Sequence, residues 1–263
     1  MSRPLTRGAG LGLGAAMIWF SLLVLIPLSA IVVKASGGGW HTYRAALSNG
    51  ETLDSLKLTV LAALLVTVVN MVLGTLIAWV LVRDRFPGVG LLDLLIDVPF
   101  ALPTIVAGLV LLSLYGPDSP IGLSWSGTPK AVFLAIAFVT LPFVVRTVQP
   151  VLEDFDTDVE DAAASLGASR WVTFRRIVLP TLVPAIFAGA SLSFARGISE
   201  YGSLVLLSGN LPHHTEVTSV RLYTYLESGD TASAAAVASV LLVVALAAIV
   251  ALDVLQRRVA RRG

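Results

Sequence analysis

Six long runs of apolar residues, separated by shorter polar segments, make up most of this sequence. At about 1.5 Å per residue, each run is long enough to cross about 30 Å of hydrocarbon as a helix. The runs extend from Gly12 to Val33, Leu58 to Val82, Leu91 to Tyr115, Ala131 to Val151, Leu182 to Leu207 and Thr231 to Leu255. The pattern predicts an all-α integral membrane protein whose six transmembrane helices form a single domain over residues 1–263.

The first run follows Arg3 and Arg7, a basic start that is also typical of a secretory signal peptide. Its length of about 20 apolar residues exceeds the usual core of a signal peptide, and no convincing small-residue cleavage site follows it. We therefore expect an uncleaved membrane anchor, with a cleaved signal as the alternative.

The overall composition supports a membrane location and excludes several other functions. Hydrophobic residues make up 56% of the chain and charged residues 13%, and the mean hydropathy is +0.86. A soluble domain of this length cannot bury so much apolar surface. Cysteine is absent, which excludes disulfides and thiolate chemistry. The net charge of +1, with basic residues at the ends of the runs, argues against a nucleic-acid partner.

Lysine and arginine residues predict the orientation, because positively charged loops are retained in the cytoplasm. With the amino terminus inside, the inner segments contain twelve of the 18 basic residues, the outer segments five, and one lies within a run. The inner residues are Arg3, Arg7, Arg83, Arg85, Arg146, Arg170, Arg175, Arg176, Arg257, Arg258, Arg261 and Arg262, and the outer ones Lys34, Arg44, Lys57, Lys130 and Arg221. Both termini and the loop between the fourth and fifth runs are therefore expected in the cytoplasm.

This loop, Glu153 to Pro180, is a polar segment of the kind in which a membrane protein is free to place function. Its first half predicts a short helix capped by Asp158, with Asp161 three residues later in a capping-box-like arrangement. Glu160 and Asp161 favour the positive end of the helix dipole. Gly167 is expected to end the helix, because glycine adopts the positive φ of a left-handed helix terminus.

The second half of the 153–180 loop predicts another helix, capped by Ser169 and ended by Pro180. Apolar residues recur at helical spacing, with arginines between them, so this helix is expected to lie along the membrane surface. The apolar positions are Trp171, Phe174 and Ile177 or Val178, and the basic ones are Arg170, Arg175 and Arg176. An amphipathic helix that only anchors the bundle is the alternative to a docking function.

The spacing of this loop, Asp161-Ala162-Ala163, then Gly167, then Ile177-x-Leu179-Pro180, resembles the coupling loop of ATP-binding-cassette importer permeases. That family more often has Glu where Asp161 stands. The resemblance implies a type I importer transmembrane fold and a cytoplasmic ATPase dimer as partner. The residues implied in ATPase docking are Glu160, Asp161, Ala162, Ala163 and Gly167, together with Arg170 and Arg175, which retention of positive charge in the cytoplasm explains equally well.

No motif for ATP hydrolysis occurs in the chain itself. A P-loop requires Gly-Lys followed by Ser or Thr, whereas the three lysines follow Val33, Leu56 and Pro129. The run Gly8-x-Gly10-x-Gly12 precedes a membrane helix without a preceding strand, which favours glycines for helix packing or a linker. We expect no catalytic residue, metal or cofactor in this chain, since the resemblance places ATP and Mg on the partner subunits.

Arg196 is the most unusual polar residue of the apolar runs, because it lies about 21 Å into the fifth run, where an isolated cation is costly. Glu200 follows four residues later on the same helical face. Two interpretations stay open: a self-neutralising structural ion pair, or a cationic lining that attracts an anion. An intramembrane enzyme is disfavoured, because no paired carboxylates or His/Ser constellation lie at matched depths.

Prolines interrupt the third and fourth runs at Pro99, Pro103 and Pro142. Such breaks persist where neighbouring groups, waters or a cavity satisfy the freed carbonyl groups. Pro99 and Pro103 are candidates for a gate or bend, and ordinary helix kinking is the alternative.

Two further stretches resemble the T-type sulfate/thiosulfate permease subunits of that importer family, Pro99 to Leu109 and Ser193 to Asn210. Molybdate/tungstate permeases share much of these motifs and are the alternative. The resemblance implies sulfate or thiosulfate import across the plasma (inner) membrane by alternating access. It also implies a related second permease subunit and an extracellular or periplasmic anion-binding protein, which faces the outer segment Asn210 to Thr231. An ion-coupled secondary transporter predicts similar halves, which the sequence does not show.

Overall fold

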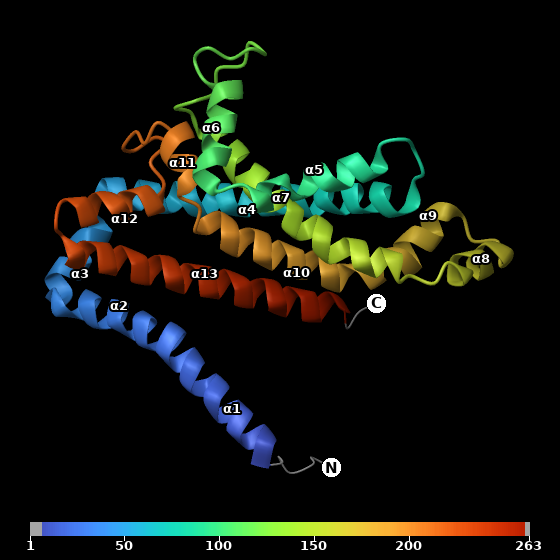
Figure 1. Cartoon of the computed structure of the whole chain (residues 1–263), viewed down its shortest axis with the longest axis horizontal. Helices are drawn as coiled ribbons and strands as arrows, with labels where there is room; N and C mark the ends of the chain where they lie inside the picture. The colour runs from blue at the N-terminus through green and yellow to red at the C-terminus, as the bar shows by residue number, and fades with distance from the viewer. Residues whose placement is uncertain (1–6, 261–263) are drawn as a thin grey trace.

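The computed structural model describes residues 7–260, and all regular secondary structure within them is helical. Four long helices run side by side in Figure 1: α4 (Gly50–Arg83), α7 (Pro129–Glu153), α10 (Leu179–Ile198) and α13 (Thr231–Ala260). The short helices α3 (Gly39–Ser48) and α12 (Thr218–Glu227) lie at one end of this bundle, and α8 (Asp158–Ser165) at the other. Arg3, Arg261 and Arg262, which entered the orientation argument, lie outside the described residues.

Within residues 7–260, five helices are long and apolar enough to cross a membrane, or six if a bent pair of helices is counted as one span. The five are Gly8–Gly37, Gly50–Arg83, Pro129–Glu153, Arg170–Ile198 and Thr231–Arg258. The pair consists of α5 (Val89–Ala101) and α6 (Thr104–Tyr115), which meet at an angle of 116°. The all-helical membrane fold is thus confirmed, and the third run, Leu91 to Tyr115, is bent at Pro103, one of the two prolines named as candidates for a bend. Leu102 is extended, with a ψ of 133°, because the ring of Pro103 disfavours helical geometry at the residue before it.

The fifth apolar run is also broken, so the predicted span Leu182 to Leu207 is wrong as a single helix. α10 ends at Ile198, and α11 (Gly202–Leu207) starts after a short turn. The buried carboxylate of Glu200 accepts hydrogen bonds from the backbone N–H and the hydroxyl of Ser203, both at 2.9 Å. A buried charge needs such donors, and the first turn of a new helix supplies them.

The core of the molecule surrounds α7, whose side chains are the most buried of the candidate spans. Two glycines let neighbouring helices approach the α7 backbone closely, as is common in membrane bundles. A Cβ added at Gly74 of α4 would lie 2.8 Å from the Cβ of Val144. A Cβ added at Gly189 of α10 would lie 2.8 Å from the Cα of Val144. No larger residue therefore fits at either position without separating the helices.

A buried polar contact adds to this packing in the middle of the bundle. The side-chain amide of Asn70 on α4 donates to the hydroxyls of Thr140 on α7, at 2.8 Å, and Ser193 on α10, at 3.3 Å. All three side chains are buried. Because buried polar groups in a membrane bundle need partners, this contact fixes the axial register of the three helices.

The amino-terminal helix stands apart from the bundle (Figure 1). It comprises α1 (Arg7–Phe20), a π-helical turn (Ser21–Leu25) and α2 (Ile26–Gly37). None of its most apolar window is buried within the chain, although α2 contacts α13. An apolar surface of this length requires lipid or another membrane protein around it.

Candidate functional site

The 153–180 loop forms a helical elbow at one end of the bundle (Figure 1). Its first helix, α8, carries Asp158, Glu160 and Asp161 in the first turn, which favours the positive end of its dipole. The predicted cap at Asp158 is wrong, because the carboxylate of Asp156 accepts the Asp158 backbone N–H at 3.0 Å. Asp158 therefore lies inside the first turn, and Thr157 precedes it without a side-chain capping bond.

Gly167 ends α8 as predicted, with a φ of +83°. The Ala168 N–H donates to the Ala163 carbonyl at 3.0 Å, and the Gly167 N–H donates to the Ala164 carbonyl at 2.9 Å. This pair of bonds is the Schellman motif, which needs a residue in the left-handed conformation at the position of Gly167. The elbow therefore has a defined bend.

The predicted cap of the second helix is confirmed, since the Ser169 hydroxyl accepts the Val172 N–H at 3.4 Å. The prediction that Pro180 ends this helix is wrong. Instead, α9 (Arg170–Thr173) continues through a π-helical turn (Phe174–Val178) into α10. The Leu179 N–H reaches back five residues to the Phe174 carbonyl, and this widened turn accommodates the missing donor of the proline. The second helix is thus an extension of the fifth span and no separate surface helix.

An ion pair joins the elbow to α4. Arg83, at the end of α4, contacts Glu160 of α8 at 2.6 Å, and both side chains are largely buried. The Arg83 guanidinium also lies over the rings of Trp79, at 5.3 Å, and Phe155, at 5.6 Å. Glu160 was predicted to contact a partner, and the structure shows it holding α8 to the bundle. Only the folded chain reveals this pair, because its members lie far apart in the sequence.

A groove of about 650 Å³ lies between the end of α4 and the elbow. Three of the predicted docking residues line it: Glu160, Asp161 and Arg170. The remainder of its lining consists of Leu76, Trp79, Ala164, Ala168, Trp171, Thr173 and Phe174.

The outer surface of the elbow carries exposed apolar side chains as well as polar ones. Of the other predicted docking residues, Ala162, Gly167 and Arg175 are exposed, and Ala163 is half-buried. Leu166 is 89% exposed and Trp171 is 66% exposed. The sequence analysis passed over Leu166, although a large apolar residue just before the bend glycine of a polar loop was a visible signal. Leu166 and Trp171 are therefore candidates for contact with another molecule.

Arg196 and Glu200 form the ion pair that their spacing indicates, at 2.7 Å. The Glu200 side chain is completely buried, whereas that of Arg196 stays 32% exposed. Leu192 and Ser199 on the same helix are also exposed. One side of the Arg196 guanidinium therefore contacts the Glu200 carboxylate, and the other side is exposed at the surface of α10.

The proline positions differ in their surroundings. Pro103 stands at the break between α5 and α6, whereas Pro99 lies inside α5 and Pro142 inside α7. Beyond the break, α6 packs across α11, where a Cβ at Gly108 would lie 2.8 Å from the Cα of Ser203. The breaks in the third and fifth spans therefore meet at one place.

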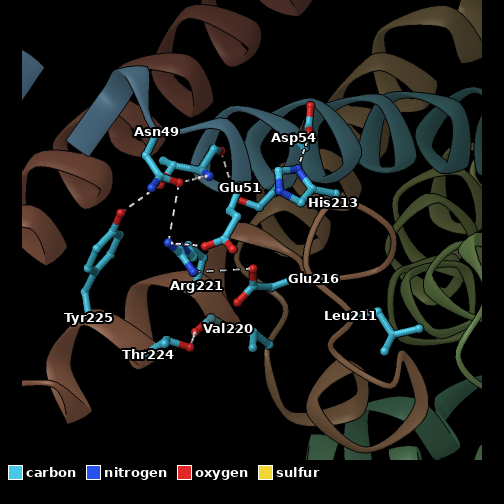
Figure 2. Close-up of polar contacts among 12 residues, drawn as sticks. Asn49, Glu51, Asp54, Leu211, His213, Glu216, Val220, Arg221, Thr224 and Tyr225 are labelled. Carbon is cyan, nitrogen blue, oxygen red and sulfur yellow. Dashed lines mark hydrogen bonds and ion pairs between the residues drawn. The ribbon is translucent and has the colours of Figure 1, made fainter. Parts of the chain in front are cut away.

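At the opposite end of the molecule, a polar cluster centres on Arg221 of α12 (Figure 2). Its guanidinium contacts the carboxylates of Glu51 at 2.6 Å and Glu216 at 3.9 Å, and lies over the ring of Tyr225. Glu216 is 5% exposed, and this burial raises the pKa of its carboxyl, an effect that the charge of Arg221 partly offsets. Arg221 thus joins three segments: the start of α4, the loop before α12, and α12 itself.

The loop before α12 is held in an unusual backbone conformation. Asn210 and His213 have φ values of 51° and 62°, a left-handed region that side chains disfavour. His213 is fixed by a contact of 2.8 Å between its Nδ1 and the Asp54 carboxylate of α4 (Figure 2). Strained residues of this kind persist where surrounding contacts hold them.

Comparison with known proteins links this chain to a sequence family. The family described as binding-protein-dependent transport system inner membrane component matches residues 70–262. A sulfate transport system permease protein CysT of Escherichia coli (strain K12) is 42% identical over 272 residues, covering 99% of this chain and 97% of the relative. The CysT protein of Synechocystis sp. is 38% identical, covering 92% of this chain and 87% of the relative.

Solved structures with the same fold are more distant in sequence. A bacterial alginate transporter, crystallised in complex with an alginate-bound periplasmic protein, has a chain with a TM-score of 0.78 and 18% identity. The match covers 94% of this chain and 93% of that one. The MetNI methionine transporter in an inward-facing conformation gives a TM-score of 0.56 at 16% identity, covering 83% and 96%.

Proposed function

Because this chain belongs to the family of binding-protein-dependent transport system inner membrane components, we propose that it is the membrane-spanning permease subunit of an ATP-driven importer of sulfate or thiosulfate. Membership places it in the inner membrane as a multi-pass permease component and not as an enzyme. ATP and Mg belong to separate ATPase subunits, and none of the chemistry of hydrolysis falls to this chain.

The helical elbow is the observation that carries this proposal. Three bundle helices converge on it: α4 through the Arg83–Glu160 ion pair, α7 through the chain itself, and α10 through the continuous helix from Arg170. A push on the elbow is therefore transmitted to the buried centre of the membrane domain. Transport by alternating access requires such a mechanical link between nucleotide binding and the helices.

The docking surface consists of the exposed residues of the elbow, including those that line its groove against α4. Asp161, Ala162 and Ala163 enter a cleft of the ATPase, where small side chains permit close approach, and Gly167 sets the bend. Leu166 and Trp171 supply the apolar contacts that anchor most protein interfaces. Arg170 and Arg175 add polar contacts, whereas Glu160 positions α8 from inside through Arg83.

The substrate assignment rests on the relatives and on Arg196. Both curated relatives described above are named as sulfate permeases, and Arg196 presents a partly exposed side chain near the end of α10. A half-exposed cation is tolerated there where it faces water or another protein instead of lipid. A second, related permease subunit beside α10 completes the pathway, with Arg196 attracting the anion. The segment around α12 receives the external anion-binding protein.

Docking is tested by co-purification of the ATPase with variants of exposed leucines at opposite ends. Leu166→Asp is expected to lower ATPase retention about tenfold or more, because a charge replaces an apolar anchor. Leu211→Asp, in the loop before α12, is the matched control and is expected to retain the ATPase. Both positions are exposed, so neither change disturbs the core. Full retention by Leu166→Asp would contradict the docking role of the elbow.

The substrate is tested by competition in the reconstituted complex. Excess sulfate and thiosulfate are expected to suppress uptake of labelled sulfate, and molybdate and tungstate are expected to compete weakly. Preferential suppression by molybdate or tungstate would assign the chain to the alternative anion class.

A further inference from the structure

A second charged cluster, which the docking proposal does not use, joins α5 to α7. The Arg146 guanidinium of α7 donates to the carboxylates of Asp93 at 2.6 Å and Asp97 at 2.7 Å, both on α5. It also donates to the Asp93 backbone carbonyl at 2.8 Å. Bidentate and charge-assisted bonds of this kind are the strongest that side chains make. Arg146 therefore clamps the inner half of the broken third span to the central helix.

The clamp continues along α7 to the elbow. The carbonyl oxygen of the Gln149 side chain accepts from Arg146 at 2.5 Å, and its amide nitrogen donates to the Glu153 carboxylate at 3.0 Å. Glu153 is the last residue of α7 and the first of the 153–180 loop. An unbroken series of hydrogen bonds thus runs from α5 to the base of the elbow.

Apart from the clamp, the inner half of the third span is attached by apolar packing, which includes Leu92 against the core. Besides the clamp, Phe100 packs edge-on against Phe143 of α7 with ring centroids 5.0 Å apart, and Ile96 is buried in the core. Its outer counterpart, α6, belongs to a different group of contacts, because it packs against α11. The extended Leu102 and Pro103 separate the two halves. Motion of α5 against α6 therefore requires rotation at one place only.

We propose that Arg146 and Gln149 are positioning residues that transmit movement of the elbow to α5, so that α5 swings about Leu102–Pro103 while α6 stays with α11. This proposal rests on the proposed docking of an ATPase at the elbow. It assigns the inner half of the third span as the element that opens the pathway toward the elbow side. Arg146 of α7 moves α5 through its contacts with Asp93 and Asp97.

The hydrogen-bond series is tested by exchanging its two final members. Gln149→Glu alone places two carboxylates together and breaks the bond to residue 153. Adding Glu153→Gln restores the bond, because the amide then donates from residue 153 and the carboxylate at residue 149 still accepts from Arg146. Sulfate transported per ATP hydrolysed is expected to fall about tenfold in the single variant and to return in the double variant. A loss that the double variant does not restore would overturn the relay.

Removing the bonds altogether gives a second test. Gln149→Leu keeps the size of the side chain and is expected to leave ATPase co-purification and ATP hydrolysis intact while uncoupling transport. Thr147→Val is the matched control on α7, since the Thr147 hydroxyl bonds only to carbonyls of its own helix. Unchanged coupling in Gln149→Leu, or release of the ATPase by it, would contradict the proposal. If Leu166→Asp retained the ATPase while Gln149→Leu still uncoupled transport, the docking role of Leu166 would fail, whereas the need for the Gln149 hydrogen bonds in coupling would stand.

The predicted movement is measurable directly, because the chain contains no cysteine. Spin labels at Leu94→Cys on α5 and Leu109→Cys on α6, both exposed, report the distance between the halves of the third span. In the full complex this distance is expected to change between nucleotide-free and ATP-bound states. In Gln149→Leu it is expected to stay constant. An unchanged distance in the otherwise native complex would refute the swing of α5.

Discussion

Single charged residues within the apolar helices are where this protein departs from a simple apolar bundle, and Arg196 of α10 is the clearest of them. Its carboxylate partner is buried and hydrogen-bonded to the start of α11, so Glu200 is committed to structure. Arg196 has donors to spare on its exposed side, because a guanidinium carries five N–H groups. The pair therefore combines a structural role for the acid with an open position beside the base.

Arg196→Gln is predicted to lower anion uptake about tenfold or more while the complex still assembles, because the attracting charge is lost from the pathway. The measurement is labelled sulfate uptake at matched complex yield. Glu200→Gln is the comparison: it leaves an uncompensated cation beside α10 and weakens the hydrogen bonds from Ser203, because a neutral amide oxygen replaces a charged acceptor, so it is expected to impair assembly. If Arg196→Gln also prevented assembly, Arg196 would be a structural residue only.

Glu216 gives a pH dependence at the opposite end of the molecule. Burial raises the pKa of its carboxyl, so the folded segment binds a proton more readily than the unfolded one. Its contribution therefore favours the folded segment at low pH and is lost as the pH rises through the folded-state pKa. Glu216→Gln is predicted to increase protection of residues 209–217 from hydrogen exchange at pH 7, with a smaller gain at pH 5. A gain in protection that is larger at pH 5 than at pH 7 would contradict the predicted direction of the pH dependence.

At the scale of elements, the bundle is organised by what α4 and α10 present to α7. Gly74 and Gly189 bring both helices against Val144, and Asn70 places a hydrogen-bonded amide between the three. Close packing and one polar contact replace the hydrophobic effect, which does not act between helices in lipid. The axial register of α4, α7 and α10 therefore depends on a few residues.

Asn70→Leu is predicted to lower the free energy of unfolding by about 1 kcal/mol, because two interhelical hydrogen bonds disappear from the bundle. Denaturant titration of the detergent-solubilised chain measures the change. Thr75→Val on the same helix is the control, since the Thr75 hydroxyl bonds only to the Met71 carbonyl. Equal destabilisation by both substitutions would show that Asn70 acts through its own helix alone.

At the scale of the whole molecule, the two proposed contact sites lie at opposite ends. The elbow lies at one end, and α12, which carries Arg221, lies at the other (Figure 1). An importer needs this separation, because the energy source and the incoming substrate are on opposite sides of the membrane. The proposed second permease subunit would contact the exposed amino-terminal helix and the partly exposed side of α10.

The orientation of the bundle is testable by labelling, and it stays a prediction of the basic-residue distribution. With Leu211→Cys, an impermeant thiol reagent is expected to react from outside intact cells. With Leu166→Cys, reaction is expected only after the membrane is permeabilised. Labelling of Leu166→Cys from outside would place the elbow on the wrong side for an ATPase partner.

The sequence by itself determined the features that arise from neighbouring residues. Three features depend on residues that are close together in the sequence: the apolar runs of membrane-spanning length, the positive-φ bend at Gly167 and the Ser169 cap. They could therefore be predicted from the sequence alone. Pro103 likewise marked a break, because proline constrains the residue before it.

Only the tertiary structure decided which residues from distant segments meet. The Arg83–Glu160 pair, the Arg146 clamp on Asp93 and Asp97, and the Arg221 cluster join different helices, and no local spacing encodes them. The turn after Ile198 and the passage of the helix through Pro180 were also decided there. In both places, a buried carboxylate or a widened turn changes where a helix can continue, and such environments exist only once the bundle has packed.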